Sequence, residues 1–449
     1  MLALLIVLAW YGWNVNGRLA LIGLGIVAMG MAAMVLHEPA LGTAVAIFVI
    51  SSNVTAFLPT ITSPFLGLAV FSILIRKLIA RNLNFRVTPF FVCTLLFFTW
   101  EWMSKLWAPT DNPLTPLPLT TFVRDLLIIV AVSWTVETPR QLRLVIIAGV
   151  LGAIVSASLT IQSFYAFLAS KEAAELAKRA SEIRFAGTFV DPNMAALSVI
   201  PFVGLGIVLF RSRGPWLLRL LGVVALVVPL VAVALSLSRG GTITALILLL
   251  MMVWAERRRW LLFSMIGVVI VIVLSVVPVD VIGRIATIGQ GSRDASIGQR
   301  ADMFWGGLQM AWDHFPLGVG LGNYGNFAMD YCRTMDHGNV AHEAYIDTIA
   351  ESGPVGLLLL LVMLASLIPE LRVKKWRISP DDFDTNIGVA MAAIFVYIIL
   401  ALAHNSYQHY PLYFVIMSVM SMRSTIFSDS RLRHLSTSTL DTLPSSDEV

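Results

Sequence analysis

Four short polar motifs interrupt a chain whose residues are 57% hydrophobic and only 13% charged. Each motif holds one side chain that is suited to chemistry: Arg184, Arg239, Arg300 and His342. A guanidinium group binds phosphate-type anions through parallel N–H donors, and imidazole accepts a proton near neutral pH. Polar groups inside or beside membrane segments cost free energy, so these four residues are candidates for function.

Arg239 lies in the polar break Ser236-Leu-Ser-Arg-Gly-Gly-Thr242, between two apolar runs. The glycines that follow it expose backbone N–H groups, so the guanidinium and a small nest of amides could hold an anion at the membrane boundary. The alternative is an arginine in a tight turn whose side chain snorkels to the interface. The motif alone leaves both interpretations open.

Arg300 begins an amphipathic segment that ends near Pro316. Large apolar residues recur there at i, i+4, i+8 and i+11, which predicts a helix with one apolar stripe against the membrane or the bundle; they are Phe304, Leu308, Trp312 and Phe315. Arg300 falls one turn earlier on the same stripe, at a depth where lipid phosphate could meet it. The alternative is a contact with a headgroup or an acidic side chain.

His342 is predicted to start a helix that enters the membrane, and the sequence Glu351-Ser-Gly-Pro354 interrupts that helix. Imidazole is the side chain best suited to act as a general base near neutral pH. A lone histidine is more often structural, so this motif needs the others to support a catalytic role.

Arg184 precedes Asp191-Pro192-Asn193, which is typical of a capped helix start. The structural interpretation is favoured for this motif, although Arg184 adds a third basic group to the same side of the membrane.

The elements that must position these residues are membrane helices. The composition excludes a water-soluble fold, and the apolar runs suit helices of about 20 residues rather than strands of a barrel. The runs lie near residues 2–13, 19–36, 39–57, 64–80, 89–104, 121–136, 144–168, 194–210, 216–237, 242–255, 260–278, 342–369, 387–403 and 411–426. We therefore predict an all-α, polytopic membrane protein with about 12–14 transmembrane helices and one long extracytoplasmic loop that contains an amphipathic helix.

Basic residues gather in five short loops, each two predicted spans from the next. They are Arg76, Lys77, Arg81 and Arg86; Arg140 and Arg143; Arg211, Arg213 and Arg219; Arg257, Arg258 and Arg259; and Arg372, Lys374, Lys375 and Arg377. The positive-inside rule assigns these loops to the cytoplasm and all four motifs to the opposite face. We predict one membrane domain over residues 1–426, with a periplasmic loop at 279–341, and a disordered cytoplasmic tail over 427–449.

Signals for metals and cofactors are weak. Asp382-Phe-Asp384 has the spacing of a metal–nucleotide motif, but it falls in a predicted cytoplasmic loop beside basic residues. His404 and His409 have no Cys or carboxylate partner at ligand spacing, and two cysteines cannot form a Cys-rich site. We expect no cofactor, no metal and no nucleic-acid partner.

The order of the motifs resembles the superfamily of O-antigen ligases and O-antigen or exopolysaccharide polymerases. It runs Arg-Phe-x-Gly-Thr-Phe-x-x-Pro-Asn, Ser-Arg-Gly, a loop with Gln-Arg, Gly-x-Gly-x-Gly-Asn-Tyr, and His-x9-Gly-x-x-Gly, over about residues 180 to 370.

This resemblance implies a metal-independent, inverting glycosyltransferase of the bacterial inner membrane, with its active site facing the periplasm. The donor would be an undecaprenyl-diphosphate-linked glycan, and the acceptor a glycan or a lipid. It assigns the role of base to His342 and diphosphate binding to Arg239 and Arg300, with Arg184 as a further basic group. Ligases commonly have Asn, Ser or Gln directly after the histidine. Glu343 stands there, which favours a polymerase slightly.

Two other classes remain open from the sequence, a secondary transporter and a flippase for lipid-linked glycans. Transporters often show repeated halves with broken helices near the midplane, and no such symmetry is visible. A flippase would need charged residues through both leaflets, whereas the cytoplasmic halves of these spans are apolar.

Overall fold

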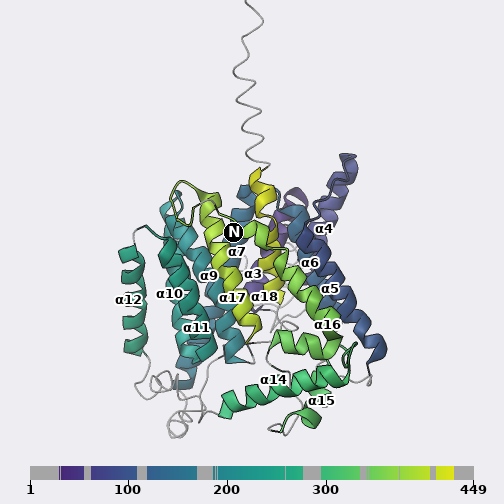
Figure 1. Ribbon diagram of the computed structural model, residues 1–449. Coiled ribbons are helices and arrows are strands. Elements are labelled where there is room, and N and C mark those ends of the chain that lie inside the picture. Colours follow the sequence, from purple (N-terminus) through teal and green to yellow (C-terminus); the bar gives the residue numbers. More distant parts are fainter. Residues whose placement is uncertain are drawn as a thin grey trace, which may run out of the picture.

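Long helices run side by side in a bundle, and two others, α14 and α15, lie across one end of it (Figure 1). This computed structural model describes residues 30, 32–54, 62–108, 119–168, 186–187, 189, 191–257, 259–276, 295–333, 341, 343–373, 375–404 and 411–428. The described part is helical without strands, which confirms the predicted fold class of an all-α polytopic membrane protein.

The helices follow the predicted apolar runs closely. Their bounds are α3 Pro39–Ser52, α4 Thr62–Ile79, α5 Pro89–Met103, η2 Ser104–Trp107, α6 Leu119–Thr135, α7 Pro139–Leu168, α9 Pro192–Arg211, α10 Trp216–Ser236, α11 Arg239–Ala255, α12 Arg259–Val276, α14 Ala295–Asp313, α15 Tyr324–Tyr331, α16 Ala344–Ala365, η5 Ile368–Leu371, α17 Phe383–Leu402 and α18 Pro411–Ser421. The predicted run 2–13, and most of 19–36, fall outside the described residues.

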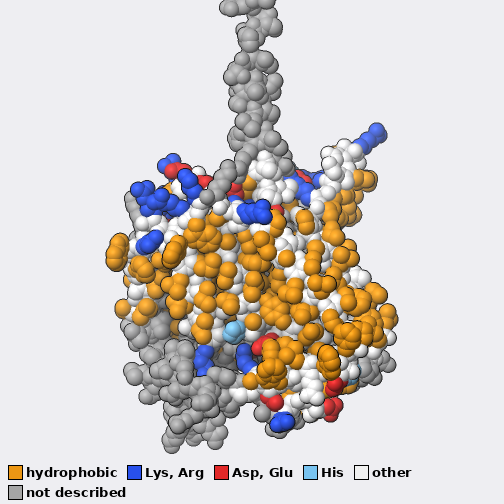
Figure 2. Space-filling view, in the orientation of Figure 1, with side chains coloured by type: hydrophobic (Ala, Val, Ile, Leu, Met, Phe, Trp, Pro, Cys, Tyr) orange, Lys and Arg blue, Asp and Glu red, His pale blue; other side chains and the backbone are white. Residues whose placement is uncertain are grey.

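Five of the described helical stretches are long and apolar enough to cross a membrane. They start at Pro139, Pro192, Trp216, Ala344 and Phe383 and have mean hydropathies between 2.1 and 2.6. Hydrophobic side chains form a broad belt across the face of the bundle in view, as expected for a surface that meets lipid (Figure 2). The chain is therefore an integral membrane protein.

Small residues bring α9 and α10 into close contact. A Cβ atom added to Gly222 of α10 would lie 2.5 Å from the backbone nitrogen of Phe210 and 2.6 Å from the carbonyl oxygen of Gly206. Lipid gives helices little hydrophobic reason to associate, so close van der Waals packing of small residues supplies much of the attraction.

The first, second and fifth basic loops lie at one end of the bundle. Lys77 of the first loop forms an ion pair with Glu137, beside the second loop, with 3.4 Å between Nζ and Oε1. The Arg143 guanidinium lies 4.5 Å from the ring centre of Phe383, at the start of α17 after the fifth loop.

The third and fourth loops join the same end. Arg211 pairs with Glu256, with 2.8 Å between Nε and Oε2, and the Ile378 amide donates to the Ala255 carbonyl oxygen at 2.9 Å. The prediction that the five loops share one face is therefore confirmed. Figure 2 shows their Lys and Arg side chains gathered along the rim above the hydrophobic belt.

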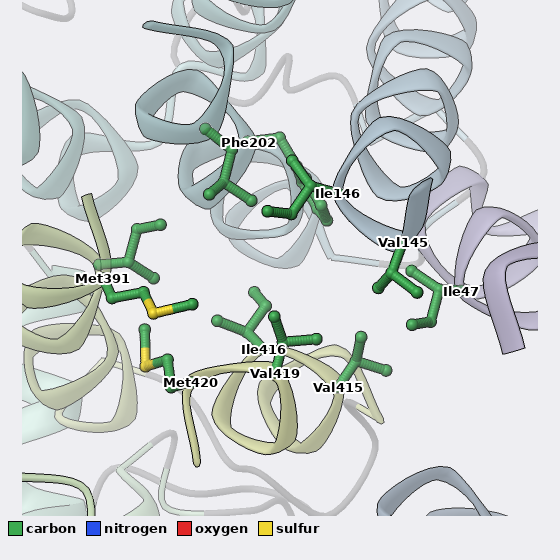
Figure 3. A pocket seen from close by; sticks show the side chains of 11 residues that line it. Ile47, Val145, Ile146, Phe202, Met391, Val415, Ile416, Val419 and Met420 are labelled. Atoms are coloured by element: carbon green, nitrogen blue, oxygen red, sulfur yellow. The ribbon is translucent and has the colours of Figure 1, made fainter. Parts of the chain in front are cut away.

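The middle of the bundle is apolar. A cavity of about 30 Å³ lies between α3, α7, α9, α17 and α18, and all eleven side chains that line it are hydrophobic, among them Ile47, Phe202, Met391 and Met420 (Figure 3). Its lining offers no proton donor, base or charge to a substrate.

We expect Gly222→Ala to destabilise the fold by about 1–3 kcal/mol, because the added methyl group would overlap the backbone of α9. Thermal unfolding in detergent measures the effect. Gly267→Ala in α12 is the matched control, since no atom lies within 4 Å of its added Cβ. Equal unfolding temperatures for the two variants would contradict the close packing of α9 on α10.

Candidate active site

The start of α11 joins the motif of Arg239 to that of Asn193. Ser238 is the N-cap of α11, and its hydroxyl accepts from the Gly241 amide at 3.0 Å and donates to Asn193 Oδ1 at 2.8 Å. Asp191 caps α9, as predicted, by accepting from the Asn193 amide. Arg239 is the first residue of α11 and half-buried, so its charge adds to the positive end of the helix dipole.

His404 links this helix start to Arg300. A Cβ on Gly240 would lie 2.9 Å from His404 Cδ2, so any larger residue there would force the imidazole ring to shift. The His404 carbonyl oxygen accepts from Arg300 Nη1 at 3.4 Å. Figure 2 shows a histidine and basic side chains at the edge of the hydrophobic belt opposite the basic loops.

The hydrogen-bond partner of the His404 ring determines which ring nitrogen carries the proton. Nδ1 lies 2.7 Å from the Leu400 carbonyl oxygen, and a carbonyl can only accept, so Nδ1 carries the proton. In the neutral ring Nε2 is then the basic nitrogen. From the sequence, His404 was considered only as a metal ligand, and its position between Gly240 and Arg300 was not predicted. The available signal was a histidine at a helix end on the same face as the four motifs.

Arg300 also faces the segment that contains His342. Burial raises the pKa of the Glu343 carboxyl above its usual value, and the nearby Arg300 cation offsets part of that rise. Glu343 is the N-cap residue of α16 and lies just before the membrane-spanning part. Arg300 is thus within electrostatic reach of the residue that follows His342.

The helix that carries Arg300, α14, is amphipathic, as predicted, but the four residues of the predicted apolar stripe do not all have the same environment. Phe304 and Leu308 pack against a small core at this end of the bundle, whereas the side chains of Trp312 and Phe315 are exposed. Met303 and Met310 supply the buried contacts instead.

The predicted break in α16 is confirmed. It anchors the glycine-rich segment from Gly318 to Tyr324, which precedes and begins α15. Gly353 has a φ of 70°, and Pro354 has no N–H to bond the carbonyl of Ala350. That carbonyl accepts from the Val319 amide at 2.9 Å instead, and the carbonyl of Glu351 accepts from Gly320 at 2.7 Å.

Side chains strengthen the same joint. Glu351 is 1% exposed and accepts from the Tyr324 amide at 2.9 Å, which fixes the start of α15. The Trp100 indole of α5 donates to the Ser352 carbonyl at 2.8 Å, and the Ser352 hydroxyl bonds Glu101 at 2.5 Å. Carbonyls freed by the break therefore all find donors from other segments.

Asp347 holds the residue before His342. It is 1% exposed, and its Oδ1 accepts from the Ala341 amide at 2.9 Å across the first turn of α16. His342 and Arg184 themselves lie outside the described residues. In the described part of the chain, Arg239 and Arg300 are linked through His404. Arg300 also lies near Glu343, the residue that follows His342.

The alternative metal motif has structural partners. Asp382 caps α17 by accepting from Thr385, and Asp384 pairs with Arg423, with 2.9 Å between Oδ1 and Nη2. Both lie at the end of the bundle that carries the basic loops. Within the described ranges, no three His, Cys, Asp or Glu side chains gather in a way that could hold a metal ion.

The fold is that of a polytopic helical membrane protein, and Arg239, Arg300 and His404 lie together at one end of its bundle. Residues 224–361 match the family model described as O-antigen ligase, which confirms the resemblance drawn from the motifs. The matched segment contains Arg239, Arg300 and His342, and supports a function of the O-antigen ligase and polymerase type. A search of curated proteins finds no match.

We expect Asp347→Ala to loosen the segment around His342, because the buried Ala341 amide would lose its acceptor. Exchange of that amide should accelerate on the order of tenfold, measured by hydrogen exchange with mass spectrometry. Asp347→Asn keeps an acceptor oxygen at the same place and should exchange at nearly the wild-type rate. Unchanged exchange in the alanine variant would show that Asp347 does not hold this segment.

Proposed function

We propose that this protein transfers a glycan from undecaprenyl diphosphate to a glycan or lipid acceptor at the periplasmic face of the bacterial inner membrane. The observation that carries the proposal is the junction at His404. It joins the start of α11, where Arg239 lies, to Arg300, at the end of the bundle where α16 begins beside His342.

The two arginines suit the leaving group. As the glycosidic bond breaks, negative charge builds on the diphosphate, and fixed guanidinium groups stabilise that charge without a metal. Arg239 adds the N-terminal dipole of α11 to its own charge. In this proposal both arginines bind the diphosphate, and Arg184 adds positive charge from its loop.

His342 acts as the general base. The acceptor hydroxyl oxygen attacks the anomeric carbon from the side opposite the diphosphate and forms the new glycosidic bond. The bond from that carbon to the diphosphate oxygen breaks, and its electron pair leaves with the diphosphate. The hydroxyl proton passes to the imidazole of His342. Because the acceptor attacks from the side opposite the leaving group, the anomeric configuration is inverted.

The location of the groups supports transfer over transport. The described cationic residues of the site gather at one end of the bundle, while the cavity in its middle is lined only by hydrophobic side chains. A transporter or flippase would need polar groups along the path between the two faces.

His342→Ala should lower the rate of glycan transfer by about 100-fold or more, because the acceptor hydroxyl would lose its base. Purified protein is incubated with an undecaprenyl-diphosphate oligosaccharide, and products are sized on a gel. A ladder indicates a polymerase, and a single addition to a supplied acceptor indicates a ligase. His37→Ala is the control, since His37 is exposed at the opposite end of the bundle.

Two outcomes would overturn the proposal. If His342→Ala transfers glycan at the wild-type rate, His342 is not the base. If wild type consumes no donor with any glycan or lipid acceptor, the protein is not a transferase, and transport of the lipid-linked glycan becomes the hypothesis to test in vesicles.

Glu343 should weaken donor binding, because its carboxylate opposes the charge that Arg300 offers to the diphosphate. Glu343→Gln is expected to lower KM for the donor by a few-fold, with kcat nearly unchanged. Burial raises the pKa of Glu343, so the carboxylate is lost at a higher pH than usual as the pH falls.

The ratio of wild-type to variant KM, measured from pH 8 down to about pH 4, should therefore fall toward one at low pH. The ratio cancels the titration of the donor, which is the same in both measurements. A ratio that stays constant over this range would contradict an electrostatic role for Glu343.

A further inference from the structure

A cationic pocket lies at the end of the bundle opposite the candidate active site. Its volume is about 340 Å³. It is lined by Trp254, Ala255, Glu256, Arg257, Arg259, Trp376 and Arg377. α11 runs from Arg239 to Ala255, so this pocket and the candidate active site lie at the two ends of one helix.

Backbone pairing builds the pocket from two loops that are far apart in sequence. Glu256 and Ile378 form a parallel β-bridge, with the Ile378 amide 2.9 Å from the Ala255 carbonyl oxygen. This bridge sets Trp376 and Arg377 beside the turn between α11 and α12. The pocket therefore has a fixed backbone frame.

The one acidic residue in the lining is already engaged. Glu256 is buried, and its carboxylate pairs with Arg211 from the end of α9 at 2.8 Å. Asp381, farther along the second loop, pairs with Arg213 at 2.5 Å. Neither carboxylate is therefore committed to the arginines of the pocket.

Three exposed guanidinium groups remain. Arg257, Arg259 and Arg377 are exposed, and within the described residues none of their side chains forms an ion pair or a hydrogen bond. Three cations around one hollow repel each other, and an anion with several acceptor oxygens relieves that repulsion while it satisfies their N–H donors.

An exposed apolar stripe continues from the pocket along α11. Trp254 is 73% exposed, and Leu250, Leu246 and Ile243 follow on the same side of the helix, at 54%, 54% and 42% exposure. Tryptophan side chains at a membrane boundary lie at the depth of the lipid headgroups. The aliphatic stripe beyond Trp254 is therefore placed to contact an acyl chain.

We propose that this pocket binds the phosphate headgroup of an anionic phospholipid, with an acyl chain along the stripe on α11. Arg257, Arg259 and Arg377 hold the phosphate oxygens, and Trp254 marks the boundary between headgroup and chain. Basic pockets between transmembrane helices at the cytoplasmic surface bind anionic lipid headgroups in this way. The site does not depend on glycan transfer, since it lies at the other end of the bundle.

Lipid binding is measured directly by native mass spectrometry of the full chain in detergent. Phosphatidylglycerol and phosphatidylcholine are added separately, with and without inorganic phosphate as a soluble competitor. We expect wild type to retain phosphatidylglycerol, and the double variant Arg257→Gln, Arg377→Gln to bind it on the order of tenfold more weakly. Phosphatidylcholine should bind weakly to both.

Arg219→Gln is the matched control, because Arg219 is an exposed arginine of α10 on the same face that does not line the pocket. It should bind phosphatidylglycerol as wild type does. Thermal unfolding checks that all variants are folded. Equal binding by the double variant and wild type would overturn the proposal. So would binding of inorganic phosphate without any preference for phosphatidylglycerol over phosphatidylcholine.

Discussion

The break in α16 is the feature on which the rest of the site depends. A proline at position 354 removes the N–H that would bond the Ala350 carbonyl, and the left-handed Gly353 turns the chain so that neighbouring carbonyls also lack helical donors. Buried carbonyls must be paired, and here Val319, Gly320 and Trp100 pair with them. The segment between α14 and α16 is therefore attached to the membrane bundle through its backbone.

Because of this attachment, the segment between α14 and α16 is held in a fixed position against the helices of the bundle. Arg300 stands on α14, whose far end leads into the segment that docks on the break, and Asp347 ties Ala341 to the first turn of α16. Arg300 thereby reaches the His404 carbonyl after the end of α17, and Ala341 is held by α16. Such fixed charges can stabilise a leaving group because they need not reorganise during the reaction.

α11 connects two cationic regions of different character. At Arg239 the helix begins, and its dipole adds to a site near His404 and Arg300. At Ala255 the helix ends, and the β-bridge to Ile378 builds a pocket for a phosphate headgroup. A lipid held there would fix the depth of α11 in the bilayer and so the height of Arg239 relative to the surface at which a lipid diphosphate arrives.

The sequence by itself determined the properties that are local. Apolar length predicted the helices, the spacing of basic residues predicted which loops share a face, Asp191 predicted the cap of α9, and Gly353-Pro354 predicted the break in α16. Only the tertiary structure decided which distant residues meet. His404 between Gly240 and Arg300, Asp347 on Ala341, and Met303 and Met310 as the buried side of α14 depend on helix packing. Periodicity within one helix says which residues share a side, but the partner of that side is set by the other helices of the bundle.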